Sequence, residues 1–203
     1  MKLKVCGMAN ARNIMEIAAT EPDCMGFIFY QKSPRFAGNL RVETLRDLPA
    51  SIKKVGVFVD EELDNMLDLA AEYQLDYIQL HGSESLDVVK KLKNAGLGVL
   101  KVFKLTNQLP ENLETFGENV DYILFDTASE MHGGSGKKFD WSVLDDYQID
   151  TPFILSGGID LSDVDQIKKM RMPQLKMIDV NSRFEDAPGM KNVAKIKALK
   201  KHL

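Results

Sequence analysis

Short apolar segments alternate with helix-type patterns along the whole chain, and this alternation restricts the fold more than any other feature of the sequence. Apolar runs lie at residues 2–8, 24–29, 54–59, 77–80, 98–103, 121–126, 152–156 and 176–180. Helical spacing of apolar residues follows them at 10–20, 41–48, 63–71, 86–92, 109–116, 141–147, 161–170 and from 190 onward. The runs are continuously apolar rather than alternating, which is typical of parallel strands buried on both faces.

Eight repeats of strand and helix predict a closed (β/α)8 barrel, the TIM-barrel fold. A doubly wound open sheet is the structural alternative, and the count of eight together with the even composition makes it the weaker one. The chain has 203 residues, and such barrels need about 200 residues at least. We therefore expect short loops and one compact domain over residues 1–203.

The charge pattern and the cysteine count exclude several classes of protein. Charged residues make up 28% of the chain, with a net charge of -4, and both signs are mixed, which argues against a nucleic-acid or membrane-surface protein. No apolar run approaches the roughly 20 residues of a membrane span. The two cysteines have no metal-type spacing, so no metal site is expected, and a cytoplasmic protein fits best. The sequence leaves open whether the protein is a monomer or a homodimer.

Polar residues follow most of the predicted strands, where a (β/α)8 barrel carries its active site. The side chains of these strand ends should meet at one rim of the barrel. The candidates are Cys6, Arg35, His81, Asp126, Gly157, Gly158, Asp179, Asn181 and Ser182.

Cys6 and Asp126 are the two candidate proton-handling groups of this rim. Each has a plain alternative, since a lone cysteine is more often a buried small hydrophobe and a lone aspartate can cap a helix. Together they suggest a thiolate base and a carboxylic acid. The base needs its pKa lowered by positive charge, for which Lys4 is the candidate, and the acid needs its pKa raised by burial.

The glycine pair Gly157-Gly158 and the polar tip at Ser182 lie where barrels of this fold bind phosphate, after strands seven and eight. This favours a small phosphorylated substrate, although a Gly-Gly pair can also simply form a tight turn. Residues 131–138 are glycine-rich but do not match the nucleotide-binding P-loop pattern. We interpret them instead as a lid over the rim.

The sequence allows two roles for Arg35 and two for His81. The planar guanidinium of Arg35, after Ser33-Pro34, suits a substrate carboxylate, but a surface loop arginine is equally compatible with the pattern. His81 suits a substrate contact and suits equally a hydrogen bond that holds its loop.

Several segments, taken in order, resemble the phosphoribosylanthranilate isomerase family of tryptophan biosynthesis. The resemblance covers essentially the whole chain, and the cysteine motif followed by Ser-Pro-Arg and by the Asp-to-Gly-Gly-x-Gly loop is its most specific part. The matching segments are Lys4-Val5-Cys6-Gly7-Met8, Gly26-Phe27-Ile28-Phe29, Ser33-Pro34-Arg35, Val55-Gly56-Val57-Phe58-Val59, Gln79-Leu80-His81-Gly82, Asp126 before Gly133-Gly134-Ser135-Gly136-Lys137, and Ser156-Gly157-Gly158-Ile159.

The resemblance implies an Amadori rearrangement of N-(5-phosphoribosyl)anthranilate that needs no cofactor. It implies that Asp126 protonates the ring oxygen and that Cys6 removes the proton at C2. It also implies substrate-binding roles, for Arg35 at the anthranilate carboxylate and for His81 and Asp179 in the pocket. The backbone at Gly157, Gly158 and Ser182 would hold the phosphate.

One departure from the family pattern matters, and it lies at the phosphate site. The family has Ser-Ser-Gly-Val-Glu after the eighth strand, whereas this chain has Asn181-Ser182-Arg183-Phe184-Glu185. Arg183 therefore replaces a glycine suited to close backbone approach. We expect Arg183 either to contact the phosphate or to project away while its backbone binds.

Two other functions are compatible with the same barrel. The related aminoimidazole carboxamide ribonucleotide isomerase would have an aspartate at the end of the first strand, where this chain has Cys6. A non-catalytic phosphosugar-binding protein would not need to retain both Cys6 and Asp126. Both alternatives are therefore weaker than the isomerase.

Overall fold

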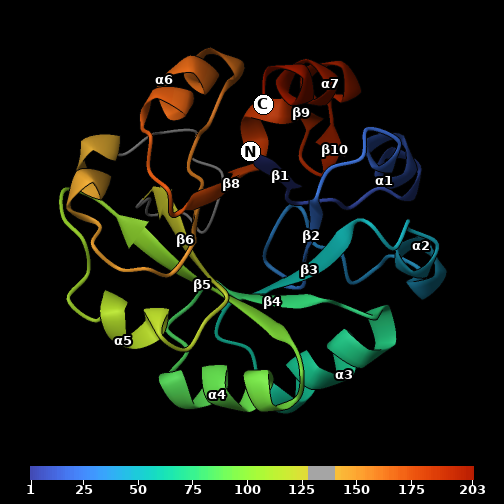
Figure 1. Ribbon diagram of the computed structural model, residues 1–203. Coiled ribbons are helices and arrows are strands. Elements are labelled where there is room, and N and C mark those ends of the chain that lie inside the picture. Colours follow the sequence, from blue (N-terminus) through green and yellow to red (C-terminus); the bar gives the residue numbers. More distant parts are fainter. Residues whose placement is uncertain (128–139) are drawn as a thin grey trace.

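The protein is described by a computed structural model covering residues 1–127 and 140–203. Eight parallel strands close into a barrel in chain order, each paired with the next and β8 paired with β1 (Figure 1). The predicted (β/α)8 barrel is confirmed. Its strands are β1 (Lys2–Val5), β2 (Cys24–Ile28), β3 (Lys53–Phe58), β4 (Tyr77–Leu80), β5 (Gly98–Leu105), β6 (Tyr122–Thr127), β7 (Phe153–Leu155) and β8 (Leu175–Val180).

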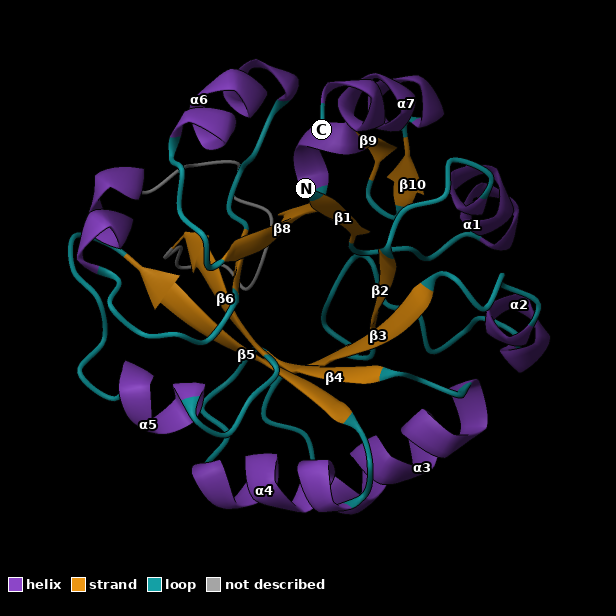
Figure 2. Cartoon of the chain, in the orientation of Figure 1, coloured by secondary structure: helices purple, strands orange, loops and turns teal. Residues whose placement is uncertain are grey.

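Helices form an outer ring around the strands (Figure 2). Asn10 caps the first of them: its side chain accepts a hydrogen bond from the backbone of Asn13 at 3.0 Å. Within the described ranges, no helix is long and apolar enough to cross a membrane. The helices are α1 (Ala11–Ala18), α2 (Val42–Arg46), α3 (Leu63–Tyr73), α4 (Leu86–Asn94), α5 (Leu113–Gly117), α6 (Val164–Lys169) and α7 (Val193–His202), with 3-10 helices at Trp141–Asp146, Leu161–Asp163 and Ser182–Phe184.

The last part of the chain differs most from the expectation. A two-stranded antiparallel sheet, β9 (Glu185–Ala187) and β10 (Met190–Lys191), occupies residues predicted as loop and helix start. α7 consequently begins at Val193, where the Asn192 side chain caps it. The segment predicted as a helix at 141–147 is a 3-10 helix, and α5 is shorter than the predicted 109–116.

The inside of the barrel is layered along the strand direction, because every second residue of a strand points inward. The layer near the amino ends is apolar and is built from Cys24, Val55, Tyr77, Leu100, Val102, Tyr122, Leu124, Ile154 and Met177. The next layer toward the carboxyl ends, two residues beyond Tyr77 and Met177 on their strands, is polar. There Lys4, Gln79 and Asp179 have exposed fractions of 0%, 2% and 5%. This buried polar layer is the floor of the carboxyl end.

One type of hydrogen bond, from a backbone N–H to an aspartate, recurs at the amino end of the barrel. The aspartate that precedes each of β2, β4 and β6 accepts a hydrogen bond from a backbone N–H of the strand before it. These bonds satisfy donors at the open ends of parallel strands, and they explain why the Asp residues stand directly before the apolar runs. The pairs are Asp23 with Leu3, Asp76 with Lys54 and Asp121 with Val99, at 2.9, 2.9 and 2.7 Å.

Candidate active site

A pocket opens at the carboxyl ends of the barrel strands. Its empty space is about 870 Å³ when the open solvent at its mouth is included. Seven of the eight strands, or the loops directly after them, contribute to its wall. The lining residues are Cys6, Ile28, Tyr30, Ser33, Val57, Val59, Gln79, His81, Leu124, Asp126, Thr127, Ser156, Gly157, Gly158, Ile159, Asp179, Asn181, Ser182 and Arg183.

The structure brings nine of the ten predicted site residues into this one pocket. They are Cys6, His81, Asp126, Gly157, Gly158, Asp179, Asn181, Ser182 and Arg183. The tenth, Arg35, is not among the lining residues. The predicted lid at residues 131–138 lies outside the described residues.

Cys6 follows β1 and is buried, with 5% of its surface exposed. The adjacent strand approaches it closely: a Cβ on Gly26 would lie 2.7 Å from the Cys6 sulfur, so only glycine fits there. Burial raises the pKa of the Cys6 thiol, while the ammonium groups of Lys4 and Lys191 act to lower it. The net direction is upward, so the neutral thiol predominates at neutral pH in the ligand-free protein. In that state the pKa of the thiol is therefore not lowered as a base requires, although the candidate cation, Lys4, is present.

Lys4 and Asp179 form an ion pair inside the barrel. Their strands are paired in register, and Nζ lies 2.9 Å from Oδ2. Burial acts to lower the pKa of Lys4, but Asp179 and Cys6 together outweigh it and the pKa is raised. Lys4 is therefore a fixed ammonium beside Cys6, and the other carboxylate oxygen, Asp179 Oδ1, is buried with no partner among the described residues.

Asp126 ends β6 on the far side of the barrel from β2. Burial raises its pKa to about 6, and the hydrogen bond from the Thr127 backbone only partly offsets this. Nε2 of His81 lies 3.6 Å from Oδ2 of Asp126. A carboxyl with a pKa near 6 is protonated in a useful fraction of molecules at neutral pH, which is what a general acid requires.

The loops after β7 and β8 are suited to an anion. Gly157 and Gly158 have φ values of 92° and 66°, a conformation that favours glycine. A Cβ on Gly157 would lie 2.3 Å from the Thr127 hydroxyl. Ser182 opens the short 3-10 helix after β8, and Arg183 adds positive charge at the pocket wall.

Arg35 is held by Glu185, which the hairpin of β9 and β10 carries. The guanidinium donates to the carboxylate through Nε and Nη2, at 2.9 and 2.7 Å. Lys191 donates to the same carboxylate at 2.5 Å and to the pocket-lining Asn181 at 2.6 Å. Burial acts to raise the pKa of Glu185, but Arg35 and Lys191 hold it below its ordinary value. The cluster of two cations and one carboxylate carries an excess positive charge beside the pocket.

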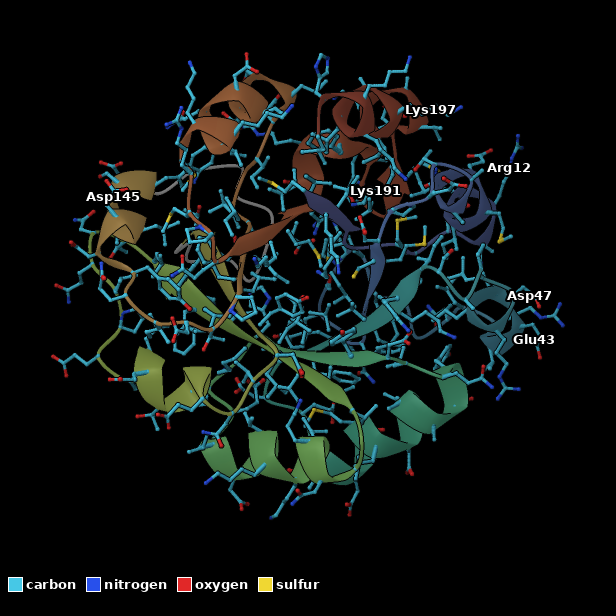
Figure 3. All side chains as sticks on the ribbon, in the orientation of Figure 1. Arg12, Glu43, Asp47, Asp145, Lys191 and Lys197 are labelled. Carbon is cyan, nitrogen blue, oxygen red and sulfur yellow. The ribbon has the colours of Figure 1, made fainter. Side chains whose placement is uncertain are left out.

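Sequence reasoning missed three polar residues of this region: Gln79, Glu185 and Lys191. Gln79 stands two residues before His81, which is the spacing of one strand face, and that signal could have identified it. Lys191 has no such signal, because it precedes a helix rich in exposed lysines. Figure 3 shows Lys191 toward β1 on the inner side of α7, whereas Lys197 lies on the outer side.

The fold and the pocket together define a class of protein: a (β/α)8-barrel enzyme with a carboxyl and a thiol at the carboxyl ends of its strands and pocket-lining loops after β7 and β8. Comparison with known proteins agrees and is more specific. Residues 3–202 match the family model described as N-(5'phosphoribosyl)anthranilate (PRA) isomerase.

Individual relatives match over nearly their whole length. N-(5'-phosphoribosyl)anthranilate isomerase from Parabacteroides distasonis is 44% identical over 97% of this chain and 90% of its own. A solved phosphoribosyl anthranilate isomerase in complex with reduced 1-(o-carboxyphenylamino)-1-deoxyribulose 5-phosphate is 30% identical, with a TM-score of 0.81 over 100% of this chain and 97% of its own. The structure of monomers generated from the dimeric Thermotoga maritima enzyme is 29% identical with the same TM-score and the same coverage. The chain belongs to the N-(5'-phosphoribosyl)anthranilate isomerase family.

Proposed function

We propose that the pocket of this protein carries out the family's reaction with Asp126 as the acid and Cys6 as the base. The protein is an isomerase of tryptophan biosynthesis, and it converts N-(5'-phosphoribosyl)anthranilate into 1-(2-carboxyphenylamino)-1-deoxyribulose 5-phosphate. The observation that supports the two roles is that one pocket presents a buried thiol and a carboxyl whose pKa is about 6. The two groups come from β1 and β6, on different walls, so a sugar can lie between them.

Opening the sugar ring needs an acid that donates a proton, and the next step needs a base that removes a proton from C2. Asp126 donates its proton to the ring oxygen as the C1–O bond breaks and the nitrogen lone pair forms a C1=N double bond. Cys6 as thiolate then removes the proton from C2, and the electrons of that bond return to the nitrogen through a C1=C2 double bond. A proton added at C1 and the loss of the C2 hydroxyl proton give the ketone product.

The ionisation of Cys6 sets a condition on this mechanism. The raised pKa means that the reactive thiolate is the minor form at neutral pH. A buried thiolate is a strong base when it forms, because its surroundings disfavour the charge. The ammonium of Lys4 keeps that form accessible.

The anionic ends of the substrate have separate sites in this proposal. Backbone N–H groups at Gly157, Gly158 and Ser182, with the Arg183 side chain, would hold the phosphate. Arg35 would bind the carboxylate through Nη1, because its Nε and Nη2 are committed to Glu185. His81 and Asp179 line the space between these ends and would contact the sugar.

We also propose a cytoplasmic setting for the enzyme, and its cysteines support it. Cys6 and Cys24 are free thiols, which supports a cytoplasmic location. A small phosphorylated substrate is the partner we propose. Both a monomer and a homodimer fit the chain, since the solved relatives include monomers made from a dimer.

The test is to supply the purified protein with N-(5'-phosphoribosyl)anthranilate and to follow the loss of its fluorescence, with the product identified by its ketone, because an isomer has the same mass as the substrate. We expect steady turnover without added metal or cofactor. A wild-type protein that leaves the substrate unchanged would contradict the proposal.

A further inference from the structure

One polar group of the pocket floor has no use in the mechanism described so far. Gln79 on β4 is 2% exposed and lines the pocket. Its Oε1 is buried and has no hydrogen-bond partner among the described residues. A buried acceptor left unpaired costs about 1–3 kcal/mol, so a folded enzyme retains one where a ligand completes it.

The other end of the same side chain fixes its direction. Nε2 of Gln79 lies 3.3 Å from Nδ1 of His81. With the amide nitrogen turned toward the ring, Nδ1 is the acceptor, and this orientation assigns the ring proton to Nε2 of His81, the nitrogen nearest Asp126. Gln79 thus holds His81 with its nitrogen and presents its oxygen to the pocket.

A second unpaired acceptor faces Gln79 from the opposite wall. Oδ1 of Asp179 on β8 is also buried without a partner, while its Oδ2 binds Lys4. β4 and β8 are four strands apart in a closed barrel of eight, so they stand across the interior from each other (Figure 1). Two acceptors at one depth require a ligand with two donors.

We propose that Gln79 is a substrate-binding residue whose Oε1 accepts a hydrogen bond from a hydroxyl group of the open sugar chain, opposite Asp179. This inference rests on the proposed function and adds a contact to the same site. A sugar chain fits because each hydroxyl can donate to one wall. The phosphate and the carboxylate are anions, so they would repel this acceptor. The secondary amine lies beyond the sugar and does not need it.

The experiment measures binding of reduced 1-(o-carboxyphenylamino)-1-deoxyribulose 5-phosphate and of its analogues that each lack one chain hydroxyl, by calorimetry. The proteins are wild type, Gln79→Met, which keeps the side-chain volume, and Gln166→Met as an exposed control on α6. For one of the hydroxyls we expect its removal to weaken binding to wild type and to the control about 10-fold, a typical neutral hydrogen bond. Gln79→Met should bind the complete ligand about as weakly and be indifferent to removal of that hydroxyl.

A second variant separates the oxygen from the nitrogen of the amide. Gln79→Glu keeps an acceptor for the hydroxyl and loses the donor to His81, so it should retain sensitivity to the same hydroxyl. The proposal is overturned if every analogue loses the same affinity in wild type and in Gln79→Met. Turnover of N-(5'-phosphoribosyl)anthranilate by wild type is measured alongside, so that a failure of this contact is distinguished from a failure of the proposed function.

Discussion

Lys4 and Asp179 are paired at 2.9 Å inside the barrel, with side-chain exposures of 0% and 5%, directly beneath the pocket. Burying two charges is costly, and such pairs are often no more stable than apolar residues of the same size. Their position beside Cys6 indicates that the pair serves the pocket rather than the stability of the fold. In the mechanism proposed above, the pair supplies a fixed cation for the thiolate and an acceptor, Asp179 Oδ1, for the substrate.

Lys4→Met should destabilise the protein by about 3–5 kcal/mol, because it leaves the Asp179 carboxylate buried and unpaired. Urea unfolding measures this loss. The double variant Lys4→Met with Asp179→Asn removes both charges and should recover most of it. If the single variant is as stable as wild type, the two groups are not a buried ion pair in solution.

Lys4→Met should also raise the pKa of Cys6 further, because its ammonium is the largest opposing influence on a thiol whose pKa is already raised by burial. The rate of alkylation by iodoacetamide at pH 8 should fall, with Cys24→Ser present in every protein so that only Cys6 is followed. An unchanged rate would show that Lys4 does not act on the thiol.

Asp126→Asn should stabilise the protein at neutral pH. Burial raises the pKa of Asp126 from 3.8 to about 6, so the folded protein binds this proton more tightly than the unfolded chain. The group contributes no difference below about pH 4, where both states are protonated, and its cost grows as the pH rises through 6. The full cost is about 3 kcal/mol.

Thermal unfolding at pH 4 and pH 7.5 measures this effect, with the exposed Asp150→Asn as the control. The gain of Asp126→Asn should be present at pH 7.5 and lost at pH 4. A gain of equal size at both pH values would mean that the pKa of Asp126 is not raised in the folded protein.

Glu185→Gln should raise the KM for substrate about 10-fold and leave kcat nearly unchanged, because the guanidinium of Arg35 loses the charge-assisted bonds that hold it at the pocket edge. It should also destabilise the protein, since Arg35 and Lys191 then face each other across a neutral amide. Adding Lys191→Met restores the charge balance and should recover part of the stability. A KM equal to that of wild type would show that the position of Arg35 does not matter for binding.

Arg183→Ala should raise the KM about 10-fold, the cost of a hydrogen bond between charged groups, and should weaken inhibition by inorganic phosphate by the same factor. Arg12→Ala, which removes an arginine with 90% side-chain exposure, is the control. If both constants stay at the wild-type values, the backbone at Ser182 binds the phosphate without this side chain.

The sequence was sufficient for the barrel and for most of the pocket, because both follow from local patterns. Strand ends are visible as apolar runs that stop, and in a parallel barrel those ends meet, so Cys6 and Asp126 could be placed on one rim. Asn10 as a helix cap is local in the same way.

What the sequence could not supply depends on contacts between distant segments. Lys191 stands among surface lysines in the chain, yet it is 1% exposed because the side chain of Asn13, on α1, hydrogen-bonds both its backbone N–H and its C=O, at 2.6 and 2.9 Å. The pairing of Arg35 with Glu185 spans 150 residues. The net direction of the Cys6 pKa could not be predicted, because burial acts against the neighbouring cations and their balance needs distances that no pattern provides.

The division of labour between Asp126 and Cys6 is the central claim, and the most direct test is turnover of N-(5'-phosphoribosyl)anthranilate by wild type, Asp126→Asn and Cys6→Ser. Binding of the reduced product analogue by each variant shows that the pocket is intact. We predict that kcat falls by about 100-fold to 10,000-fold in each variant, as expected for the loss of a general acid or base, while the analogue still binds. An Asp126→Asn or Cys6→Ser protein that turns over at the wild-type rate would contradict the account.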